Sequence, residues 1–178
     1  MNLPNLSELY DILSWHKERP EPGKHVGVFI PIPKELAKYF PKDGREGEDD
    51  SPQHISVIYI GDFNSHFEDK LKNVLQNVCS QFRPFKVKIS SKPRKFVNDK
   101  NQTVLHMPIF SQKLKKLHYS MKDELMKNAI NVSNKYPDFK PHTTLEYVNE
   151  GDKPKYKKFR FSENKEFVVE NVWIWRNK

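Results

Sequence analysis

Two short stretches of this chain place the same residue types in the same order at the start of an apolar run. The first is "SPQHISVIYIG", residues 51–61, and the second is "DFKPHTTLEYV", residues 138–148. In each, a histidine is followed two residues later by serine or threonine, and β-branched and aromatic residues typical of a strand come next. His54 and His142 are 88 positions apart, half the chain. This spacing predicts two similar lobes, each giving one strand to a shared cleft.

Each polar pair is expected to lie on one face of its strand, because residues i and i+2 point the same way. His54 and Ser56 therefore share a face, and so do His142 and Thr144. The residues between and after them point to the other face. These four are Ile55, Val57, Thr143 and Leu145, and all except Thr143 are apolar. We expect the apolar faces to pack in the core and the polar pairs to line a groove. Beyond these two short patterns, the sequence shows no internal repeat.

Two imidazoles and two hydroxyls around one groove suit phosphoryl chemistry without a metal. A neutral imidazole takes a proton from the attacking oxygen, and a protonated imidazole gives one to the leaving oxygen. The hydroxyls of Ser56 and Thr144 donate hydrogen bonds to the non-bridging oxygens, where the transition state needs its charge held. Lys140, two residues before His142, is placed to add a positive charge.

The motifs His54-Ile55-Ser56 and His142-Thr143-Thr144, the second preceded by "FKP", resemble those of the 2H phosphoesterase superfamily. That superfamily includes the RNA 2′-5′ ligase-like proteins, cyclic nucleotide phosphodiesterases and the phage anti-CBASS branch, which cleaves cyclic oligonucleotides. The resemblance implies an α+β fold whose two lobes are mostly antiparallel sheets, flanked by helices, around a central cleft. It also implies hydrolysis of a phosphodiester that has an adjacent 2′ or 3′ oxygen, with no metal and no cofactor. Ser56 stands where threonine is commoner in the superfamily.

The rest of the chain predicts an α+β order over one bilobal domain, residues 1–178. Helices are predicted where apolar residues recur with helical spacing or where a cap begins a short helix: residues 7–16, 33–40, 64–82 and 111–129. Strands are predicted over residues 25–32, 54–61, 85–90, 142–148, 157–161 and 166–175, with a hairpin over 94–109 that turns at 98–102. Residues 1–23 are interpreted as an N-terminal helix and linker, and 41–53 as an acidic loop.

Three further residues are candidates for contact with a nucleotide. In the strand predicted over residues 166–175, Glu170 shares a face with apolar neighbours. Its carboxylate either pairs with a basic residue or, if that face lines the groove, accepts from the amino group of a base. Tyr10 and Trp15 on the first predicted helix either stack on a base or pack the helix against the core. The acidic residues 46–50 are expected to be a solvated insert, because a negative segment over a phosphate would cost affinity.

The composition of the chain indicates its partners and its cellular compartment. The net charge of +8 favours polyanionic partners such as nucleotides or RNA. Cys79, the single cysteine, fits a reducing cytoplasm, and its place on the apolar side of a helix predicts a structural thiol rather than a nucleophile. No apolar run reaches the roughly 20 residues of a membrane span, and the N-terminus lacks a signal-peptide pattern. We therefore expect a cytoplasmic monomer that needs no protein partner and no membrane.

Other kinds of site fit the sequence less well. A metal site would need a carboxylate or a cysteine beside the histidines, and neither motif supplies one. A Ser-His-Asp hydrolase would need a G-x-S-x-G elbow, which the chain lacks. The alternative from another class is a non-catalytic module that binds a nucleotide or an RNA end in the same cleft, although binding alone needs no acid and base. The substrate stays open among a cyclic di- or trinucleotide, a 2′,3′-cyclic phosphate and a 2′-5′ linkage in RNA.

Overall fold

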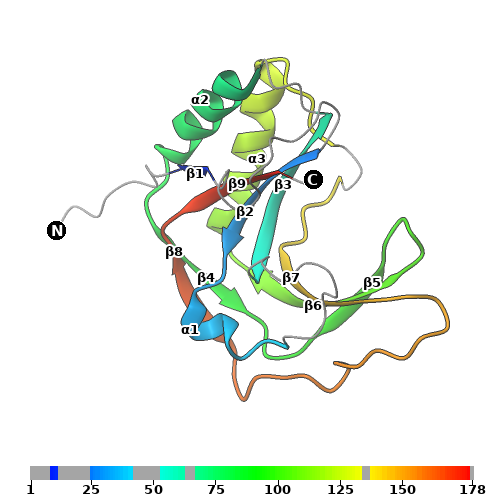
Figure 1. The fold of residues 1–178 in the computed structure, drawn as a ribbon. Helices are drawn as coiled ribbons and strands as arrows, with labels where there is room; N and C mark the ends of the chain where they lie inside the picture. The colour runs from blue at the N-terminus through cyan, green and yellow to red at the C-terminus, as the bar shows by residue number, and fades with distance from the viewer. Residues whose placement is uncertain (1–8, 12–24, 42–52, 63–66, 134–136, 177–178) are drawn as a thin grey trace.

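This computed structural model describes residues 9–11, 25–41, 53–62, 67–133 and 137–176, which form two β-sheets, two long helices and one short helix, with the loops between them (Figure 1). The elements in chain order are β1 (Leu9–Asp11), β2 (His25–Pro31), α1 (Lys34–Ala37), β3 (His54–Asp62), α2 (Glu68–Cys79), β4 (Phe85–Ile89), β5 (Arg94–Val97), β6 (Thr103–Phe110), α3 (Gln112–Lys127), β7 (His142–Val148), β8 (Lys165–Val169) and β9 (Val172–Arg176). Helices α2 and α3 lie side by side at one end of the molecule, and the short α1 lies toward the other end (Figure 1).

The strands form two sheets, and each sheet carries one of the two histidine motifs. The first sheet has the order β1-β9-β2-β3, in which β1 is parallel to β9 and the other neighbours are antiparallel. The second sheet has the order β5-β6-β4-β8, and β7 pairs with β6, all antiparallel. The expected α+β class with two mostly antiparallel sheets is thereby confirmed.

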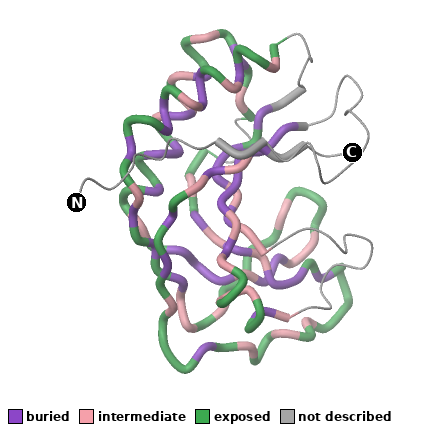
Figure 2. Tube along the Cα trace, turned by 60° about the vertical axis from the view of Figure 1, so that its left-hand side comes forward, coloured by how far each residue is buried: buried purple, intermediate pink, exposed green. Residues whose placement is uncertain are grey.

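One cluster of buried apolar side chains joins both sheets to the helices, and Figure 2 shows the buried positions along the chain. The two long helices contribute apolar side chains at helical spacing: Leu71, Val74, Leu75, Val78 and Cys79 from α2, and Leu114, Leu117, Met121 and Leu125 from α3. Ser111 caps α3, because its hydroxyl accepts a hydrogen bond from the backbone N–H of Leu114 at 3.2 Å. Within the described residues, no helix combines the length and apolar character that crossing a membrane requires.

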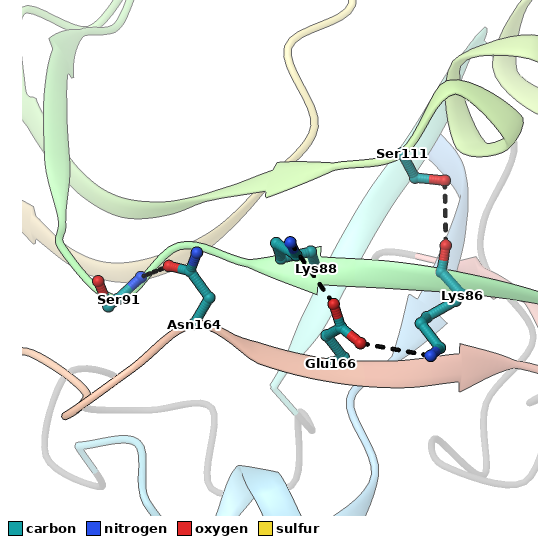
Figure 3. A network of polar contacts seen from close by, with 6 residues as sticks. All are labelled: Lys86, Lys88, Ser91, Ser111, Asn164 and Glu166. Atoms are coloured by element: carbon teal, nitrogen blue, oxygen red, sulfur yellow. Dashed lines mark hydrogen bonds and ion pairs between the residues drawn. The ribbon is translucent and has the colours of Figure 1, made fainter.

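A charged network lies on the exposed face of the second sheet (Figure 3). The carboxylate of Glu166 on β8 lies 3.4 Å from the ammonium of Lys86 and 3.6 Å from that of Lys88, both on β4. The hydroxyl of Ser111 donates to the carbonyl of Lys86 at 3.3 Å, which ties the start of α3 to the same strand. Because these charges are exposed, the network contributes little to stability and leaves the two lysines sharing one counter-charge.

Most predicted elements are confirmed. The strands expected at residues 25–32, 54–61, 85–90 and 142–148 correspond to β2, β3, β4 and β7. The hairpin at residues 94–109 forms from β5 and β6 and turns at 98–102. The helices predicted at 33–40, 64–82 and 111–129 are present but shorter, as α1, α2 and α3.

Three predicted elements are wrong. Residues 9–11 form a strand rather than part of a helix over 7–16, because they pair in parallel with β9; the rest of that segment lies outside the described residues. Residues 157–161 form turns and irregular chain, in which Phe159 and Phe161 pack their rings on Phe40 at centroid distances of 5.9 and 5.3 Å. The single strand predicted over 166–175 is two strands, β8 and β9, in different sheets. The predicted acidic loop 41–53 lies almost entirely outside the described residues.

Candidate active site

The first motif opens β3, at the edge of the first sheet. His54 and Ser56 are both partly exposed, whereas Ile55 and Val57 between and after them are buried, as strand alternation requires. The ring of Phe29 on β2 lies against His54 with the ring centroids 5.1 Å apart. His54 is therefore placed by packing on the face of the sheet that is not buried in the core.

The second motif opens β7, and its histidine is oriented by its own backbone. The Nδ1 atom of His142 lies 2.8 Å from the carbonyl of Lys140, so Nδ1 carries a proton and donates it, because a carbonyl only accepts. The rings of His106 and Phe96 lie edge-on to His142, with centroids 5.1 and 5.4 Å away. Burial lowers the pKa of His142, and its bond to Lys140 offsets part of that effect. Nε2 of a neutral His142 is then a proton acceptor.

Gln53 joins the two motifs. Its side-chain amide donates to the hydroxyl of Thr143 and to the carbonyl of Thr144, each at 2.6 Å. Gln53 directly precedes His54, and Thr143 directly follows His142. Strands β3 and β7 are accordingly in contact, although they belong to different sheets. The structure thus brings together the two motifs that the sequence places half a chain apart.

A β-bulge follows the first motif and changes which side chains accompany it. Val57 has no partner in β2, because consecutive β2 residues pair with Ser56 and Ile58. The extra residue shifts the alternation of the strand. As a result Ile58 is buried and Tyr59 is exposed, and the hydroxyl of Tyr59 lies 3.3 Å from that of Ser56.

A β-bulge also follows the second motif. Leu145 has no partner in β6, because consecutive β6 residues pair with Thr144 and Glu146. Glu146 is buried and accepts hydrogen bonds from the backbone of the 150s loop, whereas Tyr147 is exposed. The order His-x-Ser/Thr-x-x-Tyr therefore occurs twice, and each bulge turns the tyrosine toward the face of its histidine.

His118 of α3 contacts the surroundings of both motifs. Its Nδ1 donates to the carbonyl of Val57, the bulge residue of β3, at 2.6 Å. Its ring stacks on Phe139, three residues before His142, with centroids 4.0 Å apart and planes 6° apart. The side chain is buried, and burial lowers the pKa of His118. A neutral imidazole therefore fixes the bulge to the segment that leads into β7.

The other predicted binding residues differ in how the structure places them. The side chain of Lys140 is exposed, and it is the carbonyl of this residue that contacts His142. Glu170 is exposed in the link between β8 and β9, so the shared strand face that argued for base contact does not exist. Tyr10 lies in strand β1 opposite Trp173 rather than on a helix. Trp15 lies outside the described residues.

Cys79 is a structural residue, as predicted. It is 1% exposed in α2, and burial raises the pKa of its thiol to about 12, so the reactive thiolate is not formed at neutral pH. Among the described residues, no three histidine, cysteine or acidic side chains lie together as metal ligands would.

The residues that sequence reasoning missed are Gln53, Tyr59, His106, His118 and Tyr147. The tyrosines carried a signal, because "HISVIY" and "HTTLEY" share a tyrosine five positions after the histidine. A regular strand would turn position five away from position zero, and only the bulges reverse this. Gln53, His106 and His118 reach the site by tertiary contact and carried no local signal.

Comparison with known proteins agrees with the geometry. The family model described as the 2′-5′ RNA ligase superfamily matches residues 33–178. The fold is similar to E. coli LigT complexed with 3′-AMP (17% identity, TM-score 0.62, covering 89% of this chain and 90% of that one). It is also similar to TT0787 of Thermus thermophilus (14% identity, TM-score 0.66, covering 84% and 86%) and to the MHV ns2 PDE domain (10% identity, TM-score 0.58, covering 87% and 99%). No curated protein sequence matches. With most of its length matched, and with both motifs intact, this chain belongs to the 2′-5′ RNA ligase superfamily, the 2H phosphoesterases.

Proposed function

We propose that this protein is a phosphodiesterase that hydrolyses a ribonucleotide phosphodiester beside a 2′ or 3′ oxygen, using paired histidines and no metal. Membership of the 2H phosphoesterases supports activity of the phosphodiesterase type. The observation that carries the proposal is the hydrogen bonding of Gln53 to Thr143 and Thr144, which joins the two His-x-Ser/Thr motifs across the two sheets. Such a pair supplies a proton acceptor and a proton donor on either side of one phosphate.

His142 acts as the general base. Its lowered pKa keeps the ring neutral near pH 7, and the bond from Nδ1 to Lys140 leaves Nε2 as the atom that accepts a proton. Water attacks phosphorus as Nε2 takes one of its protons, and the bond from phosphorus to the ribose oxygen breaks. His54, as general acid, gives its proton to that leaving oxygen. The product is a phosphomonoester when the substrate is a cyclic phosphate.

Ser56 and Thr144 bind the non-bridging oxygens. Each lies on the face of its motif histidine, partly exposed, where a hydroxyl can donate to a phosphate held between the imidazoles. Lys140, exposed two residues before His142, adds positive charge near the second motif. Tyr59, with its hydroxyl 3.3 Å from that of Ser56, holds the serine toward the groove or contacts the phosphate beside it.

The substrate belongs to one of three classes: a 2′,3′-cyclic phosphate at an RNA end, a 2′-5′ linkage, or a cyclic oligonucleotide of the kind cleaved by anti-CBASS nucleases. Solved structures of similar fold include LigT with 3′-AMP and LigT with ATP, so nucleotides bind to proteins of this fold. The net charge of +8 favours all three polyanions equally.

The test is turnover of a panel of 2′,3′-cyclic mononucleotides, 2′-5′-linked oligoadenylates and cyclic di- and trinucleotides, with products resolved by mass spectrometry. We expect one class to be hydrolysed in excess chelator. His54→Ala and His142→Ala should each lower the rate on the order of 10²–10⁴-fold, the range for losing a general acid or base. The double variant should be little slower than either single one, because the two groups act as a unit.

Several results would contradict the proposal. No turnover of any panel member would leave only the binding-module alternative. Loss of activity in chelator with recovery on adding a divalent ion would show that a metal takes part. Near-full activity of either histidine variant would make that histidine structural. Lys95→Ala, an exposed lysine on β5, is the control for loss of a basic residue outside the two motifs.

A further inference from the structure

A row of three paired residues crosses the first sheet beside its motif. Ser56 on β3 pairs with Phe29 on β2, and Phe29 pairs with Trp173 on β9. Directly paired residues point to the same face of a sheet, so this row lies on the face of His54. The rings of Phe29 and Trp173 have centroids 6.0 Å apart, so beyond the hydroxyl the row is aromatic.

A matching row crosses the second sheet. Thr144 on β7 pairs with His106 on β6, and His106 pairs with Arg94 on β5. This row lies on the face of His142 by the same argument. Compared with the first row, the imidazole of His106 stands in the position of the Phe29 ring. The guanidinium of Arg94 stands in the position of the Trp173 indole.

His106 offers more than packing. Phe29 and His106 each lie against a motif histidine at a centroid distance of 5.1 Å, so a phenyl ring already serves this purpose in the first sheet. The Nδ1 atom of His106 lies 3.5 Å from the carbonyl of Val104, a long and weak contact that favours a proton on Nδ1 and an acceptor at Nε2. Burial, together with the nearby His142, lowers the pKa of His106 to about 4. Near pH 7 the ring is neutral and accepts hydrogen bonds.

Arg94 places a positive charge beside that ring. Its side chain is exposed, and among the described residues no carboxylate forms an ion pair with it. Arg94 is the direct cross-strand partner of His106, and its charge contributes to lowering the pKa of that ring. Lys86 and Lys88 differ in this respect, because both are paired with Glu166 (Figure 3).

We propose that Arg94 and His106 form a subsite for the nucleotide next to the scissile phosphodiester, in which Arg94 binds the phosphate of that nucleotide and His106 accepts a hydrogen bond from its ribose 2′-hydroxyl. This inference rests on the function proposed above. Arg94 stands two strand spacings, about 10 Å, from Thr144. Neighbouring phosphates in a nucleotide chain lie closer together than this, and the long side chain of Arg94 spans the remainder, so a phosphate at the motifs places its neighbour within reach of Arg94.

The chemistry of the subsite identifies its ligand class. A guanidinium makes bidentate, charge-assisted bonds to a phosphate. A neutral imidazole acceptor fits a hydroxyl donor, and the 2′-hydroxyl distinguishes RNA from DNA at a given position. The substrate is therefore an oligoribonucleotide, linear or cyclic, rather than a mononucleotide.

Binding and turnover test the subsite separately. The probes are adenosine 3′-phosphate, the ribodinucleotide ApAp, and dApAp, which lacks only the 2′-hydroxyl of the first nucleoside. Calorimetry should show that ApAp binds about tenfold more tightly than adenosine 3′-phosphate, as expected for one additional charge-assisted contact. Arg94→Ala should remove this advantage. His106→Phe, which copies the residue of the first sheet, should keep most of the advantage and lose the preference for ApAp over dApAp.

Lys95→Ala is the matched control, because it removes one positive charge from the next residue of β5, which points to the other face. It should leave all three affinities unchanged. Equal affinity of the unaltered protein for adenosine 3′-phosphate and ApAp would overturn the subsite. So would an Arg94→Ala variant that weakens both ligands equally, since Arg94 would then contact the scissile phosphate. Retained preference for ApAp over dApAp in His106→Phe would overturn the role of His106.

The 2′,3′-cyclic forms of the same three probes, followed by mass spectrometry, separate this inference from the proposed function. Turnover of the cyclic mononucleotide and the cyclic-ended dinucleotide at the same kcat/KM would support the phosphodiesterase and overturn the subsite. Tight, Arg94-dependent binding of ApAp without turnover of any panel member would overturn the phosphodiesterase and support the subsite.

Discussion

The side-chain amide of Gln53 donates a hydrogen bond to the hydroxyl of Thr143, 90 positions away in the chain, at 2.6 Å. The same amide donates to the carbonyl of Thr144 at 2.6 Å, so both of its N–H groups are used. Thr143 is fully buried, with no exposed surface. Since Gln53 precedes His54 and Thr143 follows His142, this contact sets the position of one histidine relative to the other.

Replacing Gln53 by alanine should therefore impair catalysis beyond its effect on folding. A displacement of about 1 Å between catalytic groups can cost on the order of 10²-fold in rate, and we expect kcat to fall by up to that factor. The buried hydroxyl of Thr143 loses its partner, which should lower the free energy of unfolding by about 1–3 kcal/mol. Steady-state kinetics and thermal unfolding measure the two effects.

Gln102→Ala is the control for Gln53→Ala. Gln102 also uses its amide to join two segments, donating to Asn149 at 3.0 Å, but it lies at the far end of the β5–β6 hairpin. The Gln102→Ala variant should have a lower free energy of unfolding without a comparable fall in kcat. If kcat is unchanged when the Gln53→Ala variant is fully folded, other contacts position the histidines.

The sequence alone could predict the two motifs and their strands, because each motif is local and the apolar alternation around it is strong. It also predicted α2 and α3 well, since their apolar residues recur with helical spacing. The strand over 166–175 could not be divided correctly from its pattern. Both halves are apolar and β-branched, and only pairing with β4 on one side and β2 on the other shows that the chain changes sheets at Glu170.

His118 is a positioning residue, because it binds the bulge of β3 without lying on a motif strand. His118→Phe keeps a ring to stack on Phe139 and removes the donor to the Val57 carbonyl. We expect kcat to fall by about tenfold with KM nearly unchanged, together with a loss of stability of about 1–3 kcal/mol from the unsatisfied carbonyl.

His118→Asn is the matched variant, because its amide N–H lies close to the position of Nδ1. It should recover most of the kcat lost in His118→Phe, although it loses the stacking contact with Phe139. If the two variants lose kcat and stability in the same proportion, His118 supports the fold in general and does not position the site. Crystal structures of the two variants would show directly whether the bulge at Val57 is kept.

The pH dependence of kcat/KM should identify the base. Burial lowers the pKa of His142 below its ordinary 6.5, so the ring is mainly neutral above that value and takes up its proton only at lower pH. A base must be neutral, and activity should therefore fall as the pH falls below 6.5 through the lowered pKa. The alkaline limb should reflect loss of the proton from the acid, His54, giving a bell-shaped profile of macroscopic values.

Titration of the His142 ring by NMR checks this assignment independently of kinetics. A midpoint below 6.5 that coincides with the acid limb of kcat/KM is the expected result. A midpoint at or above 6.5 would make His142 the acid and His54 the base. A flat profile across neutral pH, with chemistry shown to limit the rate by single-turnover measurements, would contradict paired-histidine catalysis.

The bulges explain why the site is larger than the sequence indicated. Regular alternation from His54 would place Ile58 and Ile60 beside Ser56 and bury Tyr59. The unpaired Val57 reverses that order, and Leu145 does the same for Tyr147. A bulge is specified by how two strands pair and by what α3 and the loops pack against, so it cannot be read from one strand's pattern.

Ser56 and Thr144 should bind phosphate rather than act as nucleophiles. Both lie within strands, two residues after a histidine, and neither occupies the turn before a helix where a nucleophilic serine is typically activated. Losing one such donor costs about 2.7–4 kcal/mol of transition-state stabilisation in a dry site, so Ser56→Ala and Thr144→Ala should be slowed on the order of 10²-fold or more but stay measurably active. Ser56→Thr should be nearly neutral, because a strand tolerates β-branching and the hydroxyl is kept.

Oxygen-18 from water should enter the product phosphate in a single turnover. A phosphorylated Ser56 or Thr144 peptide trapped during turnover would instead show a covalent intermediate, and the water would then attack that intermediate rather than the substrate.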